Sequence, residues 1–155
     1  MPSPVAPASV ALLPADPALY ALIAGSYLRL TGTALVPSGR GAAWLYCEAP
    51  FALLAHDAGP SPRFTYANLA AQACFEYSWS EMVGMQSQFS AEPAGRAERQ
   101  RLLDAVQRDG LVRGYRGLRI AKSGRRFSIE DGVIWQLTDE HGVVRGQAAR
   151  FSCAR

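Results

Sequence analysis

Few residues in this 155-residue chain have the type and spacing that chemistry would need. Ser87, Asp139 and His141 are the nearest approach to a nucleophile, acid and base. Asp139 and His141 fall in one turn-forming segment, however, where such residues usually serve the turn itself. We therefore assign no catalytic residue and expect a protein that is not an enzyme.

Metal and haem sites are not indicated either. The two histidines, His56 and His141, are far apart in the sequence, and no CxxC or HxxxH spacing occurs that would suit zinc. Haem needs an axial ligand, commonly histidine, and both histidines lie in segments that we predict to be surface loops. No metal ligand is assigned, and haem is not expected.

The cysteines and the N-terminus bear on location. Cys47, Cys74 and Cys153 are odd in number and each lies among apolar residues, which predicts reduced, buried thiols in a cytoplasmic protein. The first thirteen residues lack Lys and Arg and are broken by proline, unlike a signal peptide. No apolar run approaches the roughly 20 residues of a membrane span. Residues 1–15 are predicted to be a flexible Pro/Ala-rich leader, and no membrane association is expected.

The charge pattern does not favour nucleic acid. The net charge is only +3, and 49% of the residues are hydrophobic, which is a globular composition. Basic residues are dense in one predicted hairpin, which is either a surface for an acidic partner or a solvated sheet edge. The sequence favours the second reading for these residues: Arg113, Arg116, Arg119, Lys122, Arg125 and Arg126.

Three consecutive antiparallel strands are predicted within Gly110–Phe151, with turns at residues 122–124 and 139–142. Two shorter strands are expected earlier, at residues 51–55 and 63–67, with Phe64 and Tyr66 sharing a face. Short helices are predicted at 42–49 and 69–77, and a longer helix at 97–109, with Leu102, Leu103 and Val106 inward and Arg99 outward. Five strands with helices between the second and third indicate an α+β fold in one domain, residues 16–155.

Strand alternation predicts which residues share a face of the long strands. Phe127, Ile129, Val133, Trp135 and Leu137 share one face if a bulge near Gly132 preserves the alternation. Alternation alone leaves open which face of the last strand points inward.

An N-terminal helix is predicted at residues 16–32. Asp16 and Pro17 are typical of a helix start, and Gly32 of a helix end. Its apolar stripe either covers the sheet of its own domain or pairs with a second copy, so a homodimer through residues 16–31 is one possibility.

Several segments together resemble a known family. RFTYAN, FEY and EMVG are similar to PAS domains, and TYANLAAQACFEYSWSEMVGM, AERQRLLDAV, YRGLRIAKSGRRFSIEDGVIWQLTDEHG and GQAARF are similar to the MEKHLA domain, a PAS-like family. The resemblance extends over about residues 17–152. It implies a PAS-like five-stranded antiparallel sheet, with short helices over one face, a core at about 50–152 and a flanking N-terminal helix. The family also occurs in homeodomain–leucine-zipper plant regulators, but no homeodomain or heptad repeat is present here, so nucleic-acid binding does not carry over.

PAS-like domains are typically sensor or interaction modules, so the resemblance implies a pocket between sheet and helices. We expect it to be a cavity between Trp135, Phe127, Phe75 and Phe89, suited to a small apolar or aromatic molecule, unless the space is filled by packing. The candidate lining residues are Tyr66, Phe75, Met85, Ser87, Phe89, Arg119, Phe127, Ile129, Trp135 and Gln147.

A flavin is not expected in this pocket. Residues 84–89 are similar in spacing to the flavin-adduct motif of light-oxygen-voltage domains, but Ser87 stands where those domains have cysteine. Arg119 and Ile129 stand where they keep flavin-binding asparagines, and only Gln147 lies near their strand-end glutamine. Neither a photoactive nor a non-covalent flavin fits this pattern, and no cofactor is assigned.

The sequence therefore predicts a non-catalytic sensory or protein-interaction module. Its partner would be a small molecule, an unidentified protein or a second copy of the chain. One alternative is an enzyme acting in the same cavity, which would need a buried ionisable residue with a shifted pKa. The other is a structural self-association module.

Overall fold

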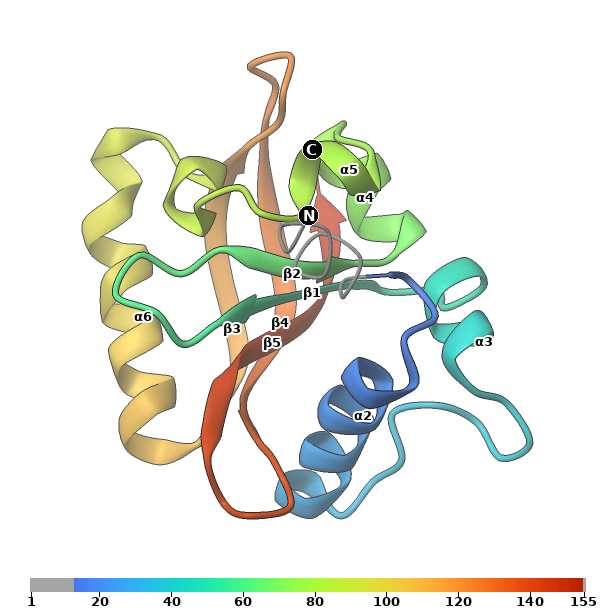
Figure 1. The fold of residues 1–155 in the computed structure, drawn as a ribbon. Helices are drawn as coiled ribbons and strands as arrows, with labels where there is room; N and C mark the ends of the chain where they lie inside the picture. The colour runs from blue at the N-terminus through green and yellow to red at the C-terminus, as the bar shows by residue number, and fades with distance from the viewer. Residues whose placement is uncertain (1–12, 155) are drawn as a thin grey trace, which may run out of the picture.

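The computed structural model describes residues 13–154 and contains one five-stranded antiparallel sheet in the order β2-β1-β5-β4-β3 (Figure 1). The predicted α+β, PAS-like architecture is confirmed, while most of the predicted leader lies outside the described residues. The strands are β1 Ala52–Asp57, β2 Phe64–Ala67, β3 Leu111–Ile120, β4 Arg126–Thr138 and β5 Val144–Ala154.

The N-terminal helix begins and ends at capping residues that the sequence supplies. The Asp16 carboxylate accepts from the Ala18 N–H at 2.9 Å at the start of the N-terminal helix, and Gly32, at φ 75°, ends it. None of the helices in residues 13–154 is long and apolar enough to cross a membrane. The helices are α2 Pro17–Thr31, α3 Ala42–Cys47, α4 Leu69–Phe75, α5 Trp79–Met82 and α6 Arg96–Asp109, with 3₁₀ turns η1 Ser87–Ser90 and η2 Pro93–Gly95.

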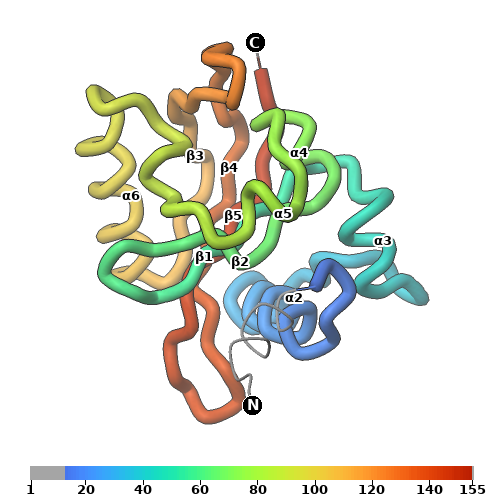
Figure 2. Tube along the Cα trace, turned by 45° about the horizontal axis from the view of Figure 1, so that its top comes forward, coloured from blue at the N-terminus to red at the C-terminus, as the bar shows by residue number. Residues whose placement is uncertain are grey.

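The two faces of the sheet carry separate apolar cores. On the outer face, α2 and α3 cover side chains such as Leu53 and Trp135. On the inner face, α4, α5 and α6 cover side chains such as Leu54 and Phe127. Figures 1 and 2 show α6 and α2 on different sides of the strands. Because successive residues of a strand point to opposite faces, each strand contributes to both cores.

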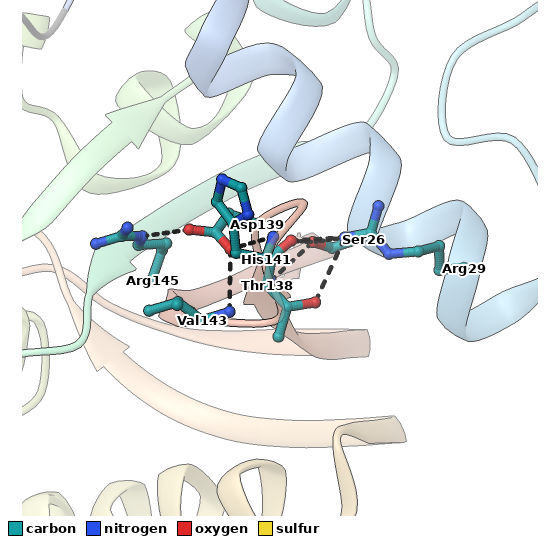
Figure 3. Close-up of polar contacts among 7 residues, drawn as sticks. All are labelled: Ser26, Arg29, Thr138, Asp139, His141, Val143 and Arg145. Carbon is teal, nitrogen blue, oxygen red and sulfur yellow. Dashed lines mark hydrogen bonds and ion pairs between the residues drawn. The ribbon is translucent and has the colours of Figure 1, made fainter.

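Helix α2 docks on its own sheet. Tyr27 packs edge-on against Trp135, with ring centroids 4.7 Å apart, and the Trp135 indole donates to the Ile23 carbonyl at 3.2 Å. The buried Ser26 hydroxyl donates to the Thr138 carbonyl and accepts from the Thr138 N–H, at 3.2 and 3.1 Å (Figure 3). The apolar stripe of α2 is therefore used within the chain. Dimerisation through this helix stays a prediction.

A bulge in β4 changes which of its side chains point to each face of the sheet. Glu130 pairs with Ser152 and Val133 with Arg150, so β4 advances three residues while β5 advances two. Asp131, at φ 53°, lies in this bulge. The bulge does not preserve the alternation that we expected: Phe127 lies in the inner core and Trp135 in the outer core.

A second irregularity lies in β2. Tyr66 pairs with Ala55 and Phe64 with His56, so Thr65 is an extra residue between them. Phe64 consequently packs on the inner face and Tyr66 on the outer face, and the prediction that they share a face is wrong.

The prediction of three buried thiols is also wrong. Cys74 of α4 and Cys153 of β5 form a disulfide, and Cys47 is exposed. The two bonded residues are 79 positions apart, and packing of α4 against the inner face brings their Cα atoms to 6.3 Å.

Candidate ligand-binding site

A small cavity of about 60 Å³ lies between the inner face of the sheet and the segment that runs from η1 to α6. Every strand and α6 contribute to its wall, so the whole inner face positions it. The lining residues are Leu54, His56, Phe64, Ser87, Ser90, Arg99, Leu102, Leu103, Tyr115, Arg119, Ile129, Gly132, Ile134, Gln147, Ala148, Ala149 and Phe151.

Two buried arginines are the most unusual part of this wall. Arg99 of α6 is 5% exposed and Arg119 of β3 is 6% exposed. Arg99 donates to the Ser87 hydroxyl, and Arg119 donates to the Leu118 carbonyl at 2.8 Å and the Tyr115 hydroxyl at 3.1 Å. Neither guanidinium forms an ion pair with a carboxylate of residues 13–154. The cavity therefore holds two cations without a direct counter-ion from this part of the chain.

The carboxylate nearest to this pair along the hydrogen bonds is Glu98, and it acts through Tyr115. The Tyr115 hydroxyl donates to Glu98 at 3.0 Å and accepts from Arg119. Burial, and next the charge of Arg119, lower the pKa of Arg99 to about 10. Arg99 nevertheless stays protonated at neutral pH, so the cavity is electropositive.

Glycines give Tyr115 its position. A Cβ atom at Gly117 would lie 2.1 Å from the Tyr115 hydroxyl oxygen, and one at Gly132 would lie 3.1 Å from the Tyr115 carbonyl. The tyrosine ring therefore lies over Gly117 on the sheet, where its hydroxyl can contact Arg119.

His56 lies in β1 and not in a surface loop, so its predicted position is wrong. The strand continues through Asp57, which leaves His56 half-buried between the cavity and a wider groove. Burial lowers its pKa, and the charge of Arg99 acts in the same direction. The neutral ring donates from Nδ1 to the Asp57 carbonyl at 2.8 Å, which makes Nε2 an acceptor.

Gln147 joins the cavity to the groove outside it. The groove, of about 660 Å³, lies among the β1–β2 loop, α6 and the start of β5, and shares His56, Leu103 and Gln147 with the cavity. Gln147 donates to the Leu103 carbonyl at 3.1 Å, while its own amide oxygen is buried without a partner in the described chain. The shared side chains mark where the cavity meets the groove.

The predicted pocket residues are divided among several places. The lining of the cavity includes Ser87, Arg119, Ile129 and Gln147. Phe75, Phe127 and Met85 pack beside it in the inner core, Tyr66 and Trp135 lie in the outer core, and Phe89 is 46% exposed under the Arg96 guanidinium.

The space expected between Phe75, Phe127, Phe89 and Trp135 is not where the cavity lies. The rings of Phe75 and Phe127 are in edge contact, with centroids 4.9 Å apart. Trp135 is on the other side of the sheet because of the β4 bulge. This part of the inner face is therefore packed, and the cavity lies nearer α6.

Sequence reasoning missed Arg99, His56, Ser90 and Tyr115 as lining residues. Arg99 lies three residues before Leu102 and seven before Val106, so it shares their helical stripe. Its charge predicts an outward position, and this prediction is wrong. His56 follows Leu54 by two positions, so strand alternation was the signal for it.

Asp139 and His141 serve the β4–β5 turn. Asp139 accepts from the backbone N–H groups of His141 and Val143, at 2.8 and 3.0 Å, and pairs with Arg145 at 2.9 Å (Figure 3). The Ser87 hydroxyl, in contrast, accepts from Arg99 in the cavity wall. The three residues do not form a catalytic set.

Comparison with known proteins agrees with this architecture. A family model described as the MEKHLA domain matches residues 18–154. A PAS domain from Colwellia psychrerythraea has a TM-score of 0.61 at 16% identity, covering 70% of this chain and 90% of its own. A light-oxygen-voltage domain studied with a flavin analogue has a TM-score of 0.57 at 20% identity, covering 73% and 82%.

The light-oxygen-voltage protein of Rhodobacter sphaeroides has a TM-score of 0.59 at 12% identity, covering 70% of this chain and 62% of its own. At these identities the likeness shows the fold alone. No curated protein gives a significant match to the chain.

The cavity as it stands does not fit a flavin. Its volume of about 60 Å³ is well below the roughly 300–1,000 Å³ typical of pockets for larger ligands. Arg99 and Arg119 line it, and Ser87 engages Arg99. The donor set of two guanidiniums suits a small anion better than a large aromatic ring system.

Proposed function

The chain belongs to the MEKHLA domain family, and on that premise we propose that it is a non-catalytic, PAS-like sensory module that takes up a small molecule in its inner-face cavity. One observation carries this proposal. The cavity is walled by polar groups that lack full partners in residues 13–154, namely Arg99, Arg119 and the Gln147 amide oxygen. Buried polar groups normally have partners, so a bound molecule is the natural complement.

The sheet offers a route from the cavity to the outer face. Ala149 of β5 lines the cavity and contacts the inner core, while its neighbour Arg150 lies over the Phe51 and Tyr27 rings, 3.9 and 5.9 Å from their centroids. A shift of β5 on ligand uptake would therefore move Arg150 against Tyr27 of α2. We propose that α2 and the outer face pass the signal on by docking to a partner protein or a second copy of the chain.

An enzyme in the same cavity is the alternative, and His56 is the observation in its favour. It is a half-buried ionisable group with a lowered pKa beside a groove. The Ser87 hydroxyl, however, bonds to Arg99 and not to this imidazole. Residues 13–154 also contain no group of three or more His, Cys, Asp or Glu placed to hold a metal. We therefore favour binding without catalysis, and without flavin.

Native mass spectrometry of the full chain purified from its own host tests uptake of a ligand. We expect a bound mass on the wild-type protein that is lost on denaturation. Ala149→Leu, which adds a side chain to the cavity wall, should lose it. Ala97→Leu makes the same change at an exposed position of α6 and should keep it.

A wild-type protein that carries no bound mass would contradict ligand uptake. A bound mass that Ala149→Leu retains in full would place the ligand elsewhere on the protein. Conversion of a bound molecule during incubation, abolished by His56→Gln, would favour the enzyme alternative.

A further inference from the structure

We propose that the ligand is a small organic monocarboxylate, with its carboxylate held by Arg99 and Arg119 and a short apolar body against Leu54, Ile134 and Phe151. This inference rests on the proposed function, since it names the chemical class that the same cavity binds.

The cavity wall contains two buried positive charges. Arg99 and Arg119 come from different elements, yet both are more than nine-tenths buried and line the same space. Burying a cation without a counter-ion is unfavourable, and two such cations near each other add mutual repulsion. An anion between them would remove both penalties.

Most hydrogen-bond donors of the two guanidiniums have no partner in residues 13–154. A guanidinium has five N–H donors in a fixed planar fork, which matches the two oxygens of a carboxylate. The contacts within residues 13–154 account for one of these donors on Arg99 and two on Arg119. Glu98 does not take the place of an anion, because it contacts the Tyr115 hydroxyl and makes no ion pair with either arginine.

The rest of the wall determines the kind of anion. Apolar side chains from four strands and α6 line the cavity, and no Asp, Glu or Lys does so. An inorganic anion would leave these apolar side chains without a complement, whereas an aliphatic body would bury against them. A volume of about 60 Å³ admits only a few heavy atoms, which points to a short chain.

Isothermal titration of the full chain with sodium butyrate tests this inference, and melting temperature provides a second readout. Butyramide has the same body without the charge, and sodium nitrate supplies an anion without the body at matched ionic strength. We expect saturable butyrate binding with a rise in melting temperature, and at least about tenfold weaker binding of butyramide and nitrate.

Variants of the two arginines locate the binding. Arg99→Gln and Arg119→Gln should each weaken butyrate binding by about tenfold or more. Arg101→Gln on α6 and Arg113→Gln on β3 are exposed matched controls that should bind as the wild type does. Arg99→Lys keeps the charge but loses the fork, so it should weaken binding and also report if Arg99→Gln fails to fold.

The outcomes separate this inference from the proposed function. Equal binding of butyramide and butyrate, unaffected by the arginine variants, would overturn the anion while leaving ligand uptake intact. Equal binding of nitrate and butyrate would overturn the organic body. If butyrate does not bind and the host-purified protein carries an uncharged molecule, the proposal that the ligand is a carboxylate would be wrong, while ligand uptake would stand.

Discussion

Arg99 occupies a position on α6 that otherwise belongs to the apolar stripe of Leu102 and Val106. A side chain of this size and charge is rarely buried without a carboxylate partner. At such a position stability and function place opposite demands on the residue, because an apolar side chain would pack better while a cation is needed for an anionic ligand.

Replacing this cation should therefore make the ligand-free protein more stable. We expect Arg99→Met, combined with Ser87→Ala to avoid an unpaired hydroxyl, to raise the free energy of unfolding by about 1–3 kcal/mol. The physical reason is removal of a buried, unpaired charge. Urea unfolding in a buffer without carboxylates measures the change.

The matched control is Arg101→Met, an exposed arginine of the same helix that should change the free energy of unfolding by less than about 0.5 kcal/mol. A loss of several kcal/mol in the double variant would mean that Arg99 already has a counter-ion in the protein. The charge of Arg99 would then give no reason to expect an anionic ligand.

Among the elements, α4 is joined to the β3–β4 turn by Glu76. This residue ends α4 at φ 63°, accepts from the Ser123 N–H at 3.1 Å and pairs with Arg125 at 2.9 Å. Arg125 in turn donates to the Cys74 carbonyl at 2.7 Å. The junction holds the helix layer of the inner face to the tip of the long hairpin.

This junction should weaken in acid. Hydrogen bonds from Ser123 and Arg125 lower the pKa of Glu76 to about 2, from an ordinary value of 4.5. A carboxylate with a lowered pKa in the folded state adds stability above its unfolded pKa and loses it as pH falls. We expect Glu76→Gln to lower the melting temperature at neutral pH, with the difference from wild type shrinking between pH 4.5 and about 2.

Circular dichroism melts across this pH range, with exposed Glu140→Gln as the control, make the comparison. A melting-temperature difference that stays constant down to pH 2 would show that ionisation of Glu76 contributes nothing.

The elements that could be predicted from the sequence are those set by local signals. Asp16, Pro17 and Gly32 mark the bounds of α2, and the turn residues separate β3, β4 and β5. The extra residue in β2 left no such signal, and Gly132 indicated the bulge in β4 but not its effect on the faces, because that effect depends on the partner strand's register. Each extra residue reversed the expected face of the residues beyond it.

The candidate site was predictable only in part, because burial of a charge and the effect of a bulge both depend on tertiary packing. Ser87 and Arg119 came from the family resemblance, and both line the cavity. Charge usually indicates a solvated face, which predicts an outward Arg99, although its spacing from Leu102 indicates the opposite and Arg99 is buried. The predicted pocket includes Trp135, but the bulge at Asp131, four residues earlier in the chain, turns this side chain to the outer face.

At the scale of the whole molecule, the disulfide closes the chain on itself. Cys74 and Cys153 join α4 to the end of β5, across 79 positions of sequence. A link across so long a loop restricts the unfolded chain and adds stability of about 2–4 kcal/mol. It also fixes the helix layer of the inner face to the strand that carries Phe151.

Thiol titration of the denatured protein checks this link. We expect one reactive thiol per chain, Cys47, without reductant and three after reduction. The double variant Cys74→Ser/Cys153→Ser should lower the free energy of unfolding by about 2–4 kcal/mol, whereas Cys47→Ser should have little effect. Three thiols without reductant in protein isolated from its host would instead agree with the cytoplasmic location predicted from the cysteine number.

The extra residue near Asp131 makes the effect of a deletion in β4 depend on where it falls. Deleting one residue between Glu130 and Val133 would restore strict alternation. Because the deletion removes the extra residue, Trp135 would stay on the outer face and Ile134 on the inner face. During divergence, a single-codon deletion within the bulge would therefore leave both cores intact, whereas the same deletion between Val133 and Thr138 would reverse the face of the residues on one side of it.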